Sequence, residues 1–189
     1  MRRIRSFIAV ELSGSVIAKA QKLAAAIAGD EAEINWVDTT AMHLTLKFLG
    51  DVPETEMNDI CRVVEATAKT VEPFELMFRG IGAFPDLTNP KSLWMGLRGG
   101  QEELAELYTA IDVAMKEKLG FPRERRAFQP HVTIGRIKHL HDPAGLAEKF
   151  AAMSSFDGDL CAVDEVTVFA SFLGRSGPTY DPIGSYELG

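Results

Sequence analysis

The sequence has few of the residues that mark disulfide-rich, zinc-binding or membrane proteins. It contains only two cysteines, Cys61 and Cys161, and their spacing matches neither a disulfide framework nor a structural zinc site. No apolar run approaches the length of a membrane span, and the first one ends at Glu11, too early for a signal-peptide core. We therefore expect a cytoplasmic protein with reduced thiols and no membrane partner.

The sequence also lacks an excess of positive charge. Its formal net charge of −7 argues against a protein that coats long nucleic acid, because such binding depends on many Lys and Arg contacts to phosphate. Residues 122–138 depart from the acidic average, with five basic side chains against one acidic side chain. Any nucleic-acid partner should therefore be bound locally, near this basic segment.

The remaining composition is that of a folded globular chain. With 189 residues, 46% hydrophobic and 25% charged, it suits a single domain, and strand-like and helix-like patterns follow one another along it. The periodicities predict strands at residues 5–11, 43–47, 74–81, 92–99 and 129–137, helices at 13–27, 54–70, 101–119 and 142–153, and a hairpin over 159–172 and 179–188.

The order of strand, helix and His-x-Thr strand occurs twice. The distance along the chain from Phe7 to His43 is 36 residues, and that from Leu93 to His131 is 38 residues. A strand-helix-strand order is common, but two His-x-Thr strands at matching places are unusual. We interpret this self-similarity as an internal duplication.

The duplication predicts the fold class. We expect one bilobal α+β domain with halves of about residues 1–85 and 91–189 and with late strands free to cross between lobes. Each of the two pseudo-symmetric lobes should be a mainly antiparallel sheet with helices on its outer face. A central cleft would then lie between the sheets.

The two His-x-Thr strands carry the chemistry. Side chains at i and i+2 of a strand share a face, so His43 lies with Thr45, and His131 with Thr133. A single such strand is most often only a strand, but two of them facing one cleft would place two imidazoles on opposite sides of a substrate.

Opposed imidazoles suit in-line displacement at phosphorus. This reaction needs a base behind the entering oxygen and an acid behind the leaving oxygen. Histidine can do either, since its unperturbed pKa is about 6.5. Threonine hydroxyls can donate hydrogen bonds to phosphate oxygens and stabilise their charge.

Two arginines flank the second motif and are candidates for attracting phosphate. Arg126 precedes His131 by five residues and Arg136 follows it by five, although a solvated surface is the default interpretation of such charges. Simple alternation places Arg136 on the face opposite His131. A bend or bulge at Gly135 would turn it back towards the cleft.

Three further residues near the first motif are candidate substrate contacts. Lys47 shares the His43 face by simple alternation, so it should line the cleft rim or extend to water. Phe48 and Trp36 are core residues by default, but either could stack a base at the cleft edge.

The other two histidines, His139 and His141, lie in a polar segment before an expected helix. They should be solvated. A metal site that includes them and Asp142 is the weaker alternative, since no third ligand is convincingly spaced.

At these motifs the chain resembles the two-histidine phosphoesterase superfamily, specifically the LigT-like RNA 2′,3′-cyclic phosphodiesterases first described as 2′-5′ RNA ligases. The resemblance is nearly end to end. It is carried by RSFIAVEL, NWVDTTAMHLTLKFLG, GAFPDLTNPKSLWMGL, RRAFQPHVTIGRI and VTVFASFLGRSGPTYDPIGSYEL.

The resemblance implies metal-independent hydrolysis, without a cofactor, of a 2′,3′-cyclic phosphate at an RNA end to a 2′-phosphomonoester. It implies that His43 is the proton donor at O3′ and His131 the acceptor from water, with Thr45, Thr133 and Arg136 as phosphate ligands. RNA termini are then the expected partners, with no obligate protein partner.

Alternatives remain from the sequence alone. The same site could run the reverse reaction, 2′-5′ ligation, or could act on small cyclic nucleotides, which the low basic charge makes plausible. A protein that binds RNA ends without turnover is a remote alternative, because binding alone does not need two opposed imidazoles.

Overall fold

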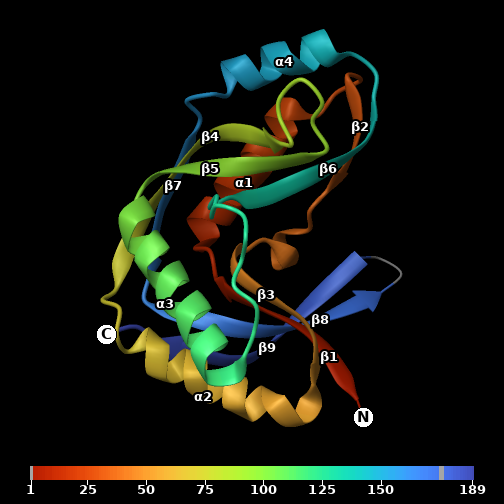
Figure 1. The fold of residues 1–189 in the computed structure, drawn as a ribbon. Coiled ribbons are helices and arrows are strands. Elements are labelled where there is room, and N and C mark those ends of the chain that lie inside the picture. Colours follow the sequence, from red (N-terminus) through yellow and green to blue (C-terminus); the bar gives the residue numbers. More distant parts are fainter. Residues whose placement is uncertain (1, 175–176) are drawn as a thin grey trace.

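The computed structural model describes residues 2–174 and 177–189, which form two antiparallel sheets with helices packed against them (Figure 1). The strands are β1 (Arg3–Val10), β2 (Ala32–Trp36), β3 (Leu44–Pro53), β4 (Phe74–Phe84), β5 (Ser92–Gly99), β6 (Val132–Leu140), β7 (Asp157–Val163), β8 (Glu165–Gly174) and β9 (Gly177–Glu187). The α-helices are α1 (Gly14–Ile27), α2 (Met57–Ala68), α3 (Gln101–Leu119) and α4 (Pro143–Ala152), and two 3-10 turns are η1 (Thr39–Ala41) and η2 (Glu54–Glu56).

The chain crosses repeatedly between the sheets. The first sheet has the strand order β3-β1-β8-β9 and the second has the order β2-β6-β5-β4-β7. Helix α1 follows β1 of the first sheet but contacts β6 and β7 of the second, whereas α3 follows β5 of the second sheet and contacts β3 and α2. Each strand-helix pair therefore contributes to both sheets, which confirms the expected two-sheet α+β class.

The helix ends follow from local sequence. The Ser13 hydroxyl accepts a hydrogen bond from the Val16 N–H at 3.3 Å and begins α1, and the Asp142 carboxylate accepts one from the Gly145 N–H at 3.0 Å and begins α4. Gly120 ends α3 with a φ of +75°, a left-handed conformation that favours glycine. These ends were predictable because each depends on one residue type.

The helix-facing sides of the two motif strands carry the four apolar side chains expected there. Four side chains on these sides are buried in the core: Leu44, Leu46, Val132 and Ile134. Their burial leaves the opposite sides of both strands to face the space between the sheets.

One strand was missed. Strand β2 is short, its alternation is weak, and only Ala32 in it is buried, so the hydrophobic pattern gives no strand signal there. It pairs with β6 at the edge of the second sheet, so this sheet takes strands from both halves of the chain. That residues 1–85 and 91–189 arose by duplication stays a prediction.

Neither cysteine is paired: Cys161 is buried and Cys61 is half-buried, both as free thiols. Within residues 2–174 and 177–189, no helix combines the length and apolar character needed to cross a membrane.

Candidate active site

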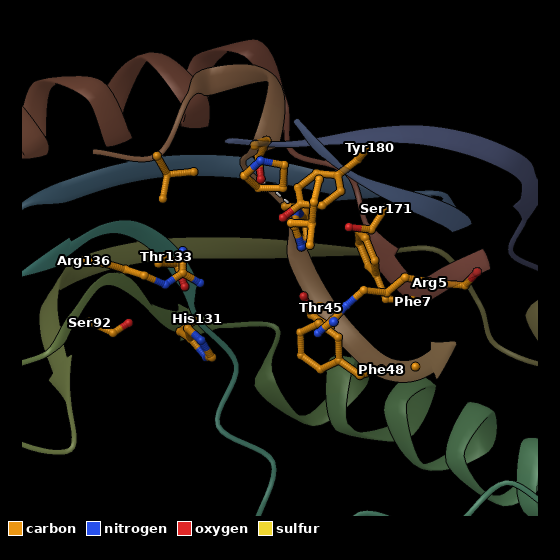
Figure 2. A pocket seen from close by; sticks show the side chains of 17 residues that line it. Arg5, Phe7, Thr45, Phe48, Ser92, His131, Thr133, Arg136, Ser171 and Tyr180 are labelled. Carbon is orange, nitrogen blue, oxygen red and sulfur yellow. Dashed lines mark hydrogen bonds between the residues drawn. The ribbon is translucent and has the colours of Figure 1, made fainter. Parts of the chain in front are cut away.

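A cavity of about 620 Å³ lies between the two sheets and is lined by both motifs. Figure 2 shows His131, Thr133, Arg136 and Ser92 on one side of it, and Thr45, Phe48, Arg5, Phe7 and Tyr180 on the other. The remaining lining residues are His43, Ser6, Val37, Ala41, Gly50, Ser171, Leu173 and Pro178. The structure thus brings the two His-x-Thr pairs together around one cavity.

The two histidines are held in the same way. Each ends the loop that enters its strand, and His43 Nδ1 lies 2.8 Å from the carbonyl oxygen of Ala41, whereas His131 Nδ1 lies 2.6 Å from that of Gln129. A carbonyl oxygen can only accept, so Nδ1 carries a hydrogen in both rings. In each neutral imidazole, Nε2 is therefore the free nitrogen, able to accept a proton or, once protonated, to donate it.

Aromatic side chains fix the His43 ring. Phe7 stacks against it with ring centroids 4.7 Å apart, and Tyr180 meets it edge-on at 5.0 Å. Burial lowers the pKa of His43, the hydrogen bond to Ala41 opposes that shift, and positive charge on His131 lowers the pKa further. The neutral form of His43 is therefore favoured.

His131 has a different aromatic neighbourhood. Phe84 meets its ring edge-on with centroids 4.8 Å apart, and Trp94 lies 6.1 Å away. Burial lowers the pKa of His131 and the hydrogen bond to Gln129 opposes that shift. Burial is thus the main cause that lowers the pKa of both histidines.

The cavity is suited to an anion. Among the described residues, the hydroxyls of Thr45 and Thr133 make no hydrogen bond within the protein, so both are available to a ligand. Arg5 and Arg136 line the cavity, and none of its described lining residues is a carboxylate. In a chain with a net charge of −7, this local excess of positive charge favours phosphate binding.

Arg136 reaches the cavity because its strand is bulged. In the β5–β6 ladder Leu93 pairs with Gly135 and Trp94 with Thr133, so Ile134 is the extra residue. A bulge shifts the alternation by one position. Arg136, three residues after Thr133, therefore lines the same cavity, and the simple alternation that placed it on the opposite face is wrong.

A matching bulge in β3 exchanges the expected places of Lys47 and Phe48. In the β1–β3 ladder Ile8 pairs with Lys47 and Ala9 with Thr45, so Leu46 is the extra residue. Phe48 consequently lines the cavity with 65% of its surface exposed, so its default placement in the core is wrong.

The expectation that Lys47 lines the cleft rim is also wrong. Its side chain is 1% exposed and turns towards α3, where Nζ donates to Asp112 at 2.6 Å and to the Pro122 carbonyl at 2.9 Å. The bulge at Leu46 is the physical reason, because it moves Lys47 to the helix-facing side.

Other predicted residues lie outside this cavity. Arg126 lines a second groove that adjoins it. Trp36 is 37% exposed on β2 and does not line the cavity. His139 and His141 are exposed, as expected, and the described residues contain no cluster of three or more metal-ligating side chains.

Sequence reasoning missed several lining residues, notably Arg5, Phe7, Ser92 and Tyr180. Arg5 and Phe7 lie at i and i+2 of one strand, so their common face was readable from RSFIAVEL once β1 was placed beside β3. Tyr180 gave no signal, because its position depends on the pairing of β8 with β9.

Comparison with known proteins places the chain in a family. The family model described as the 2′-5′ RNA ligase superfamily matches residues 14–171. The chain belongs to this superfamily. Among curated members, proteins named RNA 2′,3′-cyclic phosphodiesterase from Methanothermobacter thermautotrophicus and Aquifex aeolicus are 31% and 28% identical to it, covering 98% and 100% of this chain and 100% of their own lengths.

Solved structures of other proteins share the fold. A protein of Thermus thermophilus has a TM-score of 0.81 with 24% identity, covering 97% of both chains. Escherichia coli LigT complexed with 3′-AMP has a TM-score of 0.78 with 23% identity, covering 99% of both chains. Both solved structures therefore share the fold of this chain over nearly its whole length.

Proposed function

We propose that the chain is an RNA 2′,3′-cyclic phosphodiesterase that opens the cyclic phosphate to a 2′-phosphomonoester. The observation that carries the proposal is the pair of imidazoles on opposite sheets, each with Nδ1 hydrogen-bonded to a carbonyl and Nε2 free. Membership of the 2′-5′ RNA ligase superfamily supports it, as do full-length relatives that are named for this activity.

In the proposed reaction, water attacks phosphorus as His131 accepts one of its protons. The bond from phosphorus to O3′ breaks on the opposite side, and protonated His43 donates its proton to O3′. One P–O bond forms and one breaks. Afterwards His131 releases its proton to solvent and His43 takes up a proton from solvent, so both histidines regain their starting protonation states. This is in-line displacement with general acid and base catalysis.

The remaining lining residues hold the phosphate. Thr45 and Thr133 donate hydrogen bonds to the two non-bridging oxygens, and Arg136 supplies a charged donor beside Thr133. Each of these hydrogen bonds becomes stronger as negative charge grows on those oxygens, so it stabilises the transition state more than the bound substrate.

The deciding experiment uses an RNA that ends in a 2′,3′-cyclic phosphate, incubated with the protein in EDTA. We expect a product ending in a 2′-phosphate, identified by its resistance to a phosphatase specific for 3′-phosphates and by mass. A 3′-phosphate product, loss of turnover on chelation, or tight binding without any product would overturn the proposal. We also propose a cytoplasmic location, which the two free thiols support.

A further inference from the structure

A second groove of about 600 Å³ adjoins the catalytic cavity. The two share Thr45, Phe48, Ser92 and His131, which come from both sides of the site, so the groove opens directly from the catalytic cavity. One cavity of this size is enough for a single nucleotide-sized ligand. A cyclic mononucleotide would thus occupy the catalytic cavity and leave the groove empty.

The groove carries the two features of single-strand nucleic-acid sites. Lys91 and Arg126 line it, and across residues 2–174 and 177–189 neither side chain has a carboxylate within ion-pair distance. One acidic residue, Glu124, also lines it. Aromatic side chains line the same groove, and Phe48 is the most exposed of them. Cations that follow a phosphate backbone and aromatic faces that stack bases are the usual combination for binding a single strand.

The outer wall of the groove is held in place. Although residues 120–131 form neither helix nor strand, they run from the end of α3 back to β6 (Figure 1). Near their start, buried Asp112 accepts from Arg123 Nε at 2.9 Å and Lys47 Nζ donates to the Pro122 carbonyl at 2.9 Å.

The far end of this wall is fixed by stacking. The ring of Phe128 lies parallel to that of Tyr108 on α3, with centroids 4.1 Å apart and 7° between their planes. A wall anchored at both ends needs little ordering when a ligand binds, which favours a specific site over an adaptable surface.

We propose that this groove binds the nucleotide that precedes the cyclic-phosphate nucleotide, with Arg126 and Lys91 contacting the phosphodiester that joins them. The inference rests on the proposed function and narrows its substrate to RNA strands instead of small cyclic nucleotides. The groove adds binding energy outside the reacting bond, which a strand can use and a mononucleotide cannot.

The test compares two substrates in steady-state kinetics: adenosine 2′,3′-cyclic phosphate and the dinucleotide of adenosine that ends in the same cyclic phosphate. For the unaltered protein we expect kcat/KM to be higher for the dinucleotide. Arg126→Gln and Lys91→Gln should each lower the dinucleotide-to-mononucleotide ratio of kcat/KM about tenfold, as expected for one charged hydrogen bond. The salt dependence of the dinucleotide reaction should also weaken. The slope of log kcat/KM against log salt concentration should become shallower by about 0.7 for each phosphate contact that is lost.

Arg125→Gln is the matched control, because Arg125 is the exposed neighbour of Arg126 and lines neither cavity. It should keep the substrate ratio and the salt slope of the unaltered protein. Equal kcat/KM for the two substrates, or equal effects of Arg125→Gln and Arg126→Gln on their ratio, would overturn the groove assignment and leave the proposed function standing. Failure to hydrolyse either substrate would overturn the proposed function itself.

Discussion

Phe48 and Arg136 lie at equivalent positions of the two motif strands. Each follows its motif threonine by three residues, each comes after a bulge, and each pairs with a cavity-lining residue of the adjacent strand, Phe7 for Phe48 and Ser92 for Arg136. The backbones of the two motif strands are therefore alike, whereas the side chains at this position differ completely. At this position the first motif strand presents an aromatic ring and the second presents a guanidinium group, so similar backbones present different side chains to the substrate.

This asymmetry predicts the effect of changing Arg136. Arg136→Gln should lower kcat/KM for a cyclic-phosphate RNA end about tenfold to a hundredfold, the usual effect of losing a charged hydrogen bond. Arg136→Lys should recover part of the loss, because it restores the charge without the planar fork. Steady-state kinetics would measure both.

Lys138→Gln is the control for that series. Lys138 lies two residues further along β6, where its Nζ donates to Glu33 at 3.0 Å outside the cavity. Arg136 has no role in phosphate binding if the two glutamine variants reduce kcat/KM by the same factor.

Removing either imidazole of the cavity should stop most of the turnover. His43→Ala and His131→Ala should each lower kcat by about two to four orders of magnitude, as general acid or base removal does. His139→Ala, which alters an exposed histidine 69% accessible at its side chain, should keep the normal rate. Single-turnover cleavage of a labelled RNA would measure the three rates.

The direction of proton transfer can be tested with a substrate whose 3′ oxygen is replaced by sulfur. A thiolate leaves without protonation because thiols have a pKa of about 8.5, far below that of an alcohol. His43→Ala should therefore recover activity on this substrate and His131→Ala should not. The opposite pattern would assign the acid role to His131.

The pH dependence of kcat/KM follows from the lowered pKa values of both histidines. The rate rises with pH as the base becomes neutral and falls as the acid loses its proton, so a bell-shaped profile is expected. Burial lowers both pKa values from 6.5, and the maximum of the bell should therefore lie below pH 6.5. The kcat profile should lie at higher pH, because the bound phosphate anion favours protonated imidazoles. A kcat/KM maximum above pH 6.5 would contradict this account.

The buried pair of Lys47 and Asp112 should matter for stability. Both side chains are at most 3% exposed, and leaving one member of a buried ion pair uncompensated costs about 3–5 kcal/mol. Asp112→Asn should lower the free energy of unfolding by this order, as measured by urea denaturation. Glu65→Gln, which breaks an exposed pair with Lys69, should cost about 0.5 kcal/mol or less.

The same pair gives a pH signature. Burial works to raise the pKa of Asp112, but hydrogen bonds from Lys47 and Arg123 outweigh it and hold the pKa below its usual value. A lowered carboxyl pKa adds stability that is present above the unfolded value of about 3.9 and is lost as the pH falls through the folded value. The stability difference between the unaltered protein and Asp112→Asn should thus shrink in acid. A difference that stays constant would contradict the pairing.

The placement of the two His-x-Thr pairs along the cavity was predictable from sequence because it depends on side chains two residues apart in one strand. His43 with Thr45 and His131 with Thr133 needed only the strand period, and the caps at Ser13 and Asp142 needed only one residue type each. These features are local, so local patterns predict them.

The positions of Lys47, Phe48 and Arg136 were not predictable in the same way. Each depends on a bulge, which is a property of two paired strands and not of either one alone. Gly135 was suspected as the bend. The extra residue is its neighbour Ile134, and a side chain at Gly135 would come within 2.8 Å of Ile34 and 2.9 Å of Trp36 on β2, a strand the sequence did not reveal.

Because the chain crosses between the sheets, the molecule could be divided into two fragments that are active only when they assemble. Residues 86–89 form an exposed turn between β4 and β5, and a break there would separate His43 from His131 while giving neither fragment a complete sheet. Each fragment would contain strands that pair with strands of the other fragment in both sheets. Phosphodiesterase activity would then return only when the two fragments assemble, so the rate of turnover would measure the amount of assembled protein.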